Sequence, residues 1–167
     1  MDVRDLMTWE VRSCHPDENL GVVAMMLWEQ DCGIVPVLER GTNRLVGVVT
    51  DRDICMAAAT KDRKPAKIAV SEILNGSPRS CLPDEDLKTA MDVMADAQVH
   101  RLPVVDESNV LKGILSMNDL ILASGPGGKR GGPVPDGEVM EVLRAVSRHR
   151  KNSAVLDPKL GNRVGAP

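Results

Sequence analysis

The feature that most constrains this 167-residue chain is an internal repeat. Residues 3–57 return as residues 70–123, at an offset of 67 that falls to 66 after one residue is lost from the predicted turn at 40–44. A single one-residue gap is what two copies of one fold would show. Because a repeat period sets an architecture, any functional site should occur twice at matched positions.

The repeat divides the chain into two units and a tail. A unit of about 55 residues buries too little surface to be stable alone, so the two copies should pack against each other. The linker between them is charged and interrupted by Pro65, and glycine and proline dominate the start of the tail. The predicted boundaries are a first unit at 1–59, a linker at 60–69, a second unit at 70–124 and a tail at 125–167.

Hydrophobic periodicity predicts an α/β fold in which each unit has the order β-α-β-β-α. Apolar residues at helical spacing follow Asp17 and its counterpart Asp84, which predicts a helix with an acidic first turn in each copy. Two β-branched runs come next, and Pro36 or Pro103 either places the first of them at a sheet edge or marks its first residues. The expected strands span 34–38, 45–49, 102–105 and 111–115, with short extended segments at 11–14 and 80–82.

The tail should contain a last amphipathic helix that opens at Pro135 and Asp136 on a glycine- and proline-rich tether. Its apolar stripe needs a cover, which is either the body of the same chain or a partner subunit. The whole chain has a formal charge of −3, but residues 125–167 alone sum to +4. A basic tail can bind nucleic acid, dock on its own acidic body or stay solvated.

Composition narrows the function classes. Phe and Tyr are absent and Trp9 and Trp28 are the only aromatic residues, so a nucleic-acid partner is not expected. The four cysteines form no CxxC pair, which favours reduced core residues in a cytoplasmic protein over a metal site. We find no signal peptide, no membrane-spanning run and no catalytic motif. The sequence therefore predicts neither an enzyme nor a metal or required cofactor.

Each unit closes on the motif Gly-x-x-(Thr/Ser)-x-x-Asp, at residues 47–53 and 113–119. A hydroxyl residue that ends a strand caps the next helix, whose free N–H groups suit a phosphate. An aspartate in the first turn can accept hydrogen bonds from the hydroxyls of a ribose, and the glycine leaves room for a ligand. The alternative is a capping box that only starts a helix. Duplication at matched positions favours ligand binding.

These motifs, together with the segment His100-Arg-Leu-Pro-Val-Val-Asp106, resemble the cystathionine β-synthase (CBS) domain pair over residues 3–124. The resemblance implies two units about a pseudo-twofold axis, with two clefts for adenosine-containing ligands such as AMP, ADP or ATP. It also implies a homodimer and a regulatory sensor that signals occupancy by a change of conformation or association. The tail after Ser124 lies outside it.

The family pattern assigns one cleft, here called the first cleft, to Thr50 and Asp53. It implies that His100 and Arg101 reach the phosphates of a ligand there, because they precede the strand that faces this motif. Asn118 would line the same phosphate region. This cleft combines a ribose acceptor with two basic side chains, so we expect a phosphorylated ligand to prefer it. The alternative is that the basic pair is merely exposed.

The second cleft would hold Ser116 and Asp119. The positions that match the basic pair are Gly33 and Ile34, so this cleft lacks it, although Arg52 could supply a charge. The two clefts are therefore not expected to be equivalent. Two other hypotheses stay open. One is an interaction module with degenerate clefts that binds a partner through its C-terminal helix, and the other is redox or metal sensing by the cysteines.

Overall fold

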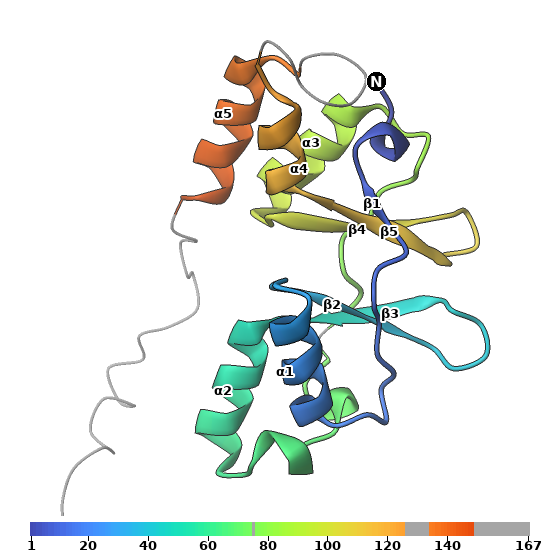
Figure 1. The fold of residues 1–167 in the computed structure, drawn as a ribbon, viewed down its shortest axis with the longest axis vertical. Helices are drawn as coiled ribbons and strands as arrows, with labels where there is room; N and C mark the ends of the chain where they lie inside the picture. Colours follow the sequence, from blue (N-terminus) through green and yellow to red (C-terminus); the bar gives the residue numbers. More distant parts are fainter. Residues whose placement is uncertain (75, 126–133, 149–167) are drawn as a thin grey trace, which may run out of the picture.

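The chain forms two bodies, each a small sheet with helices on its outer side, and the two sheets face each other (Figure 1). The computed structural model describes residues 1–74, 76–125 and 134–148. The first body contains α1 (Leu20–Glu29), β2 (Val35–Leu38), β3 (Leu45–Val49) and α2 (Asp51–Lys61). The second body contains β1 (Thr8–Trp9), α3 (Leu87–Ala97), β4 (Arg101–Val105), β5 (Leu111–Ser116), α4 (Met117–Ala123) and α5 (Asp136–Val146).

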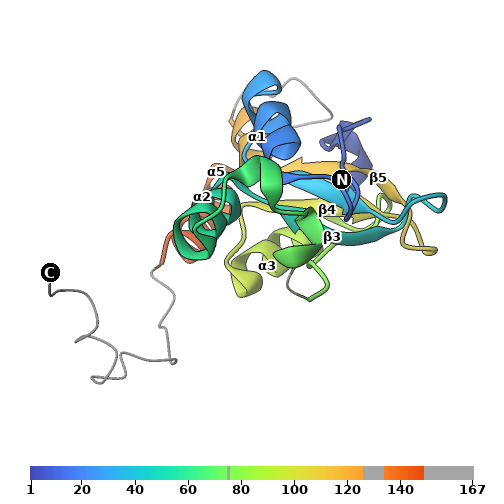
Figure 2. The ribbon, with the colours of Figure 1, turned by 90° about the horizontal axis from the view of Figure 1, so that it is seen from below.

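The α/β class and the two repeated units are confirmed. Figure 2 shows the molecule from below, and in this view the strands of the two bodies overlap. The helices α2 and α5 lie on one side of the molecule in both views. Most of the predicted tether, at 126–133, and the end of the basic tail, at 149–167, lie outside the described residues. Within the described ranges, no helix is long and apolar enough to span a membrane.

The proline-bearing strands lie at sheet edges, as predicted. β2 pairs antiparallel with β3 alone, and β4 is an outer strand of the order β1-β5-β4. An edge suits a residue with no N–H to donate. The carbonyls of Pro36 and Pro103 accept hydrogen bonds from the backbone N–H groups of Cys14 and Cys81, at 3.0 and 3.1 Å. These contacts tie down the two short extended segments.

The predicted acidic first turn of α1 and α3 is wrong. The helices begin at Leu20 and Leu87, with Asn19 and Asp86 as the N-cap residues, so Asp17 and Asp84 precede the first turn. The two cap side chains accept backbone N–H groups, at 3.1 and 3.2 Å, which satisfies donors that the first turn leaves free. Asp17 instead accepts two hydrogen bonds of 2.9 Å from Arg40, which hold the pKa of the carboxyl below its usual range.

The leading segment of each repeat belongs to the other body. Val3 and Met7 are buried in the core of the second body, and β1 pairs with β5. Conversely, Ile68 and Val70 are buried in the core of the first body. The N–H of Val70 donates to the carbonyl of Glu18 at 2.8 Å. The two cores therefore exchange segments. The predicted units at 1–59 and 70–124 follow the repeat in the sequence, and each differs from the set of residues that forms one core.

The glycines of the two motifs make room for these exchanged segments. A Cβ on Gly113 would overlap the carbonyl oxygen of Thr8, and a Cβ on Gly47 would lie 2.6 Å from Cδ2 of Leu74. Glycine therefore lets a strand approach each position more closely than a side chain would allow. The prediction that they leave room for a ligand is wrong, because chain from the exchanged segments occupies that space.

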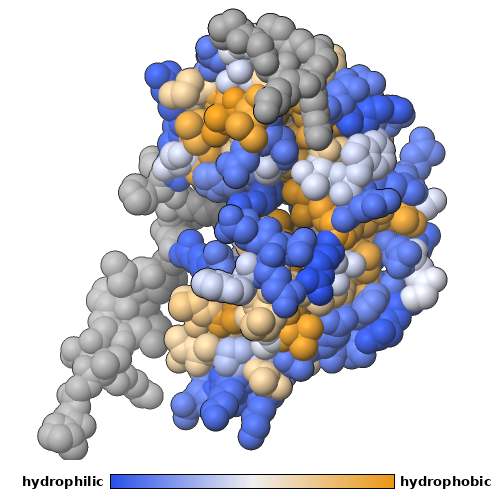
Figure 3. Space-filling view, in the orientation of Figure 1, coloured by the Kyte–Doolittle hydropathy of each residue, from blue (hydrophilic) through white to orange (hydrophobic). Residues whose placement is uncertain are grey.

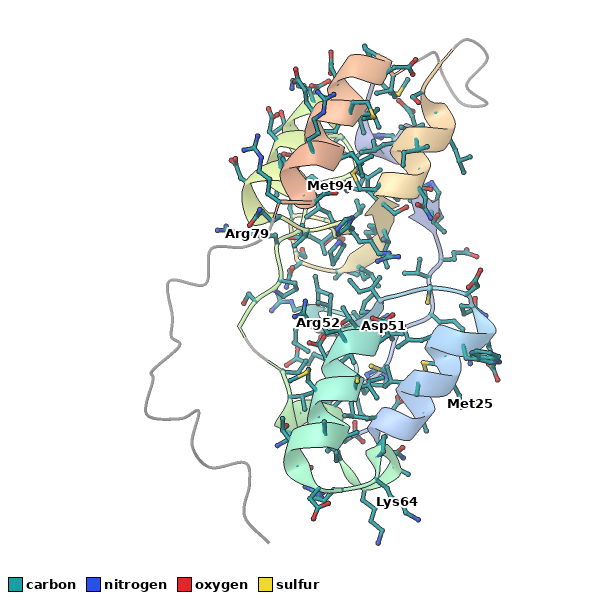
Figure 4. All side chains as sticks on the ribbon, turned by 90° about the vertical axis from the view of Figure 1, so that its left-hand side faces the viewer. Met25, Asp51, Arg52, Lys64, Arg79 and Met94 are labelled. Atoms are coloured by element: carbon teal, nitrogen blue, oxygen red, sulfur yellow. The ribbon has the colours of Figure 1, made fainter. Side chains whose placement is uncertain are left out.

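The last helix, α5, packs on α3 and α4 of the second body. Val139, Val142 and Val146 are buried in one core with Met94 of α3 (Figure 4). The side chain of Gln98 donates to two backbone carbonyls near the C-terminus of α5, each at 3.2 Å. The apolar stripe is thus covered by the same chain, which was one of the two alternatives for it.

Substitution of the two glycines tests the exchange. Gly113→Ala should lower the free energy of unfolding by about 1–3 kcal/mol, because the added Cβ meets rigid backbone. Gly47→Ala is the matched control, and it should cost roughly 1 kcal/mol or less, because the end of a leucine side chain can move. Urea unfolding followed by circular dichroism measures both. Equal effects would contradict the packing of Thr8 on β5.

Candidate functional site

The two motifs have the same local structure. Thr50 caps α2 and Ser116 caps α4, and each hydroxyl donates to Oδ2 of the aspartate three residues on, at 2.7 and 2.6 Å. The backbone N–H groups of Asp53 and Asp119 donate back to the hydroxyls at 3.2 and 3.3 Å. The capping-box alternative is therefore realised in both copies. Oδ1 of each aspartate accepts no hydrogen bond from the described residues, so one carboxylate oxygen stays open to a ligand.

The second cleft is a cavity of about 260 Å³ between the two bodies. Ser116 and Asp119 line it with Ile34, as expected, and Asp119 is half-buried there. Arg101 and Asn118 also line this cavity, although both were assigned to the first cleft. The further lining residues come mainly from the segment after β1 and from the end of α1, and include Glu10, Val11, Arg12, Gln30 and Asp31.

The first cleft is a second cavity of about 260 Å³. Thr50, His100 and Arg101 line it together, as the family pattern implied, and Arg79 joins them. Neither Asp53 nor Arg52 lines either cavity, and both side chains are exposed. Figure 4 shows Arg52 at the end of α2 that faces the second body. On the face drawn in Figure 3, hydrophilic surface lies near the centre of the molecule, beside hydrophobic surface to its right.

The two cavities are built from matched positions of the repeat. Their linings share six pairs at the repeat offset, namely Val11 and Pro78, Arg12 and Arg79, Cys32 and Val99, Ile34 and Arg101, Ile114 and Val48, and Ser116 and Thr50. Ile34 and Arg101 form one of these pairs, and each lines both cavities. The pseudo-twofold axis therefore passes between these two side chains.

The charges of the two linings differ. The first cleft has Arg79, His100 and Arg101 and no acidic residue in its lining. The second cleft contains three carboxylates among its lining residues, and its Arg12 forms an ion pair with Glu29 at 2.8 Å. Among the described residues, no group of three or more His, Cys, Asp or Glu side chains could hold a metal ion.

Sequence reasoning missed Arg12 and Arg79 as lining side chains. The available signal was the repeat itself, since both arginines stand at the same place in the two copies. The sequence also predicted Arg101 in the first cleft alone. In the structure Arg101 lines both cavities, and its guanidinium extends to Gly33 of the first body. A Cβ on Gly33 would lie 3.2 Å from both terminal nitrogens of Arg101. A long side chain can reach either cleft, which a motif does not reveal.

Comparison with known proteins matches the fold and the motifs. A family model described as CBS domain matches residues 3–60 and 70–125. The CBS domain-containing protein YhcV of Bacillus subtilis (strain 168) is 34% identical over 118 residues, which are 71% of this chain and 81% of that protein. The solved structure of CBSX2 in complex with AMP has a TM-score of 0.62 and 26% sequence identity, over 72% of this chain and 92% of that chain.

An enzyme is also among the relatives. The homoserine O-acetyltransferase of Methanohalophilus mahii (strain ATCC 35705 / DSM 5219 / SLP) is 33% identical over 129 residues. These residues are 77% of this chain but 26% of that enzyme. The likeness therefore covers a minor part of the enzyme and carries no catalytic role to this chain.

The capping boxes can be tested separately from any ligand. Ser116→Ala and Thr50→Ala should each lower the free energy of unfolding by about 1 kcal/mol, because each removes an acceptor for a helix N–H. Ser108→Ala, in an exposed turn, is the control and should change it by less than about 0.5 kcal/mol. Chemical denaturation measures all three. An unchanged value for Ser116→Ala would contradict the capping role.

Proposed function

This chain belongs to the CBS domain family, and from that premise we propose that it is a regulatory module that binds an adenosine-containing ligand between its two bodies. The observation that carries the proposal is the pair of matched cavities, which share an arginine at the pseudo-twofold axis. The similarity to CBSX2 in complex with AMP supports it. The class of ligand is thus an adenine nucleotide or a related adenosyl compound.

The second cleft offers groups for each part of such a ligand. Oδ1 of Asp119 is placed to accept a hydrogen bond from a ribose hydroxyl, as acidic residues do in dinucleotide-binding folds. The guanidinium of Arg101 supplies charge-assisted hydrogen bonds to a phosphate. Val11, Ile34 and Ile114 provide apolar surface for an adenine. We therefore place the ribose in the second cleft, because Asp119 lines its cavity and Asp53 does not.

Signalling follows from the position of the cavities. Each is about 260 Å³, slightly below the roughly 300–1,000 Å³ of ligand pockets, so a nucleotide requires some movement of the bodies or side chains. A ligand that contacts both bodies favours the arrangement that it binds best, by no more than its differential affinity. On this proposal the module reports occupancy through its shape, and its role is regulatory instead of catalytic.

The rival hypotheses have less support. An interaction module that binds a partner through the last helix needs its apolar stripe, and α5 buries that stripe on α3 and α4. Redox or metal sensing needs reactive thiols. Burial raises the pKa of the Cys14 and Cys81 thiols to about 12, so these two stay protonated near neutral pH, and the hypothesis would have to rest on the exposed Cys55 and the half-buried Cys32. Four free cysteines support a reducing, cytoplasmic compartment.

We further propose that the chain forms a homodimer through the outer helices of the first body. Trp28 is 83% exposed, and Met25 on α1 and Met56 on α2 are 55% and 53% exposed. Figure 4 shows Met25 on the outer side of α1. Such side chains are typical of an interface. On the second body α5 covers part of α3 and α4, but α4 still exposes Leu122 and Ile121, at 76% and 45%, so the first body is chosen because it carries Trp28.

Titration with AMP tests the ligand. The chain should bind AMP in a calorimeter, and Asp119→Asn should weaken binding about tenfold, because a charged acceptor for the ribose is lost. Asp53→Asn is the matched control and should change the dissociation constant less than about threefold. No heat with AMP at millimolar concentration would contradict the proposal, and an effect of Asp53→Asn alone would assign the ribose to the first cleft.

Sedimentation tests the homodimer. Trp28→Ala should raise the dissociation constant of the dimer about tenfold or more, because exposed tryptophans at interfaces contribute strongly to binding. Trp9→Ala removes the other tryptophan, 52% exposed on the second body, and should leave the constant unchanged. A wild-type chain that stays monomeric at all concentrations would overturn this assembly.

A further inference from the structure

Within the part of the chain that the structure describes, Arg101 and Ile34 are the only lining residues that the two cavities share, and they occupy matched positions of the repeat. The repeat therefore places one cation on the pseudo-twofold axis, opposite an aliphatic side chain where a symmetric molecule would have a second arginine. One guanidinium thus faces two cavities. This asymmetry has a consequence for any ligand that carries a phosphate.

The guanidinium is free to serve an anion. It is half-buried, yet among the described residues it donates no hydrogen bond and forms no ion pair. By contrast, Arg12 in the second cleft is held by Glu29 at 2.8 Å. Partial burial of a cation without a hydrogen-bond acceptor costs free energy, and a bound phosphate would supply the missing acceptor.

The position of the side chain depends on Gly33. Both terminal nitrogens of Arg101 lie 3.2 Å from the place of a Cβ on Gly33, so alanine there would displace the guanidinium by a few tenths of an ångström and a larger side chain would displace it further. Gly33 has no positive φ, so alanine fits its backbone without strain. Glycine thus lets Arg101 extend across the axis toward the first body.

We infer that Arg101 is a single phosphate-binding residue shared by both clefts, so that a phosphorylated ligand in one cleft lowers the affinity of the other for a second. This inference rests on the proposed function and adds a coupling between its two cavities. One guanidinium carries a single positive charge, and when its terminal nitrogens extend into one cavity they leave fewer donors for the other, where a second phosphate would also be repelled by the first. The first cleft keeps Arg79 and His100 when Arg101 is engaged elsewhere, whereas the second cleft keeps only the paired Arg12.

Nuclear magnetic resonance can read the two clefts separately in the full chain. The backbone amides of Val48 and Ile114 occupy matched positions, one in each cavity, and their shifts during a titration give one dissociation constant per cleft. With AMP as the probe, the two constants of the wild type should differ by about tenfold or more. Adenosine, which has no phosphate, should separate the two constants less than AMP does, because only the ribose and adenine contacts then differ between the clefts.

Variants distinguish a shared arginine from one that serves a single cleft. Arg101→Met should weaken AMP binding in both clefts by about tenfold and leave adenosine unchanged. Arg79→Met is the matched control, since that arginine lines the first cleft alone, and it should weaken AMP there only. Gly33→Ala should weaken AMP in the second cleft and not in the first.

The outcomes separate the two proposals. If Arg101→Met weakens AMP in one cleft only, or if wild-type clefts fill with equal constants, the sharing of Arg101 is overturned while nucleotide binding stands. If neither AMP nor adenosine shifts any amide signal, the proposed function fails, and the sharing fails with it.

Discussion

The structure depends on the exchange of leading segments between its two bodies. β1 completes the sheet of the second body, and the segment around Ile68 and Val70 completes the core of the first. Neither body has a finished core without chain from the other repeat, so the two copies should fold as one cooperative unit. Gly113 permits this arrangement, because only a residue without a side chain accepts the backbone of Thr8 so closely.

The exchange also fixes where the clefts lie. It holds the two sheets face to face, which brings the helix starts of α2 and α4 to the boundary between the bodies. The result is two cavities of equal volume, and the positions at which the two repeats differ give their linings different charges. The departure on which our inference rests is Arg101 against Ile34 on the axis, because one guanidinium lines both cavities there, whereas the charges of the remaining lining residues differ between them.

Local patterns in the sequence predicted the strands, their proline edges and the two capped helix starts, because each depends on neighbouring residues. They did not predict the two-residue strand β1, whose pairing with β5 joins residues more than a hundred positions apart. The start of α1 was placed too early, since Asp17 and Asn19 both suit a helix N-terminus. The position of Arg101 required the fold, since its side chain is long enough to reach either cleft.

A crystal structure of the chain saturated with AMP tests the central claim most directly. The account predicts the ribose hydroxyls on Asp119 in the second cleft and the phosphate on the guanidinium of Arg101. Nucleotide outside both clefts, or a phosphate held without Arg101, would contradict it.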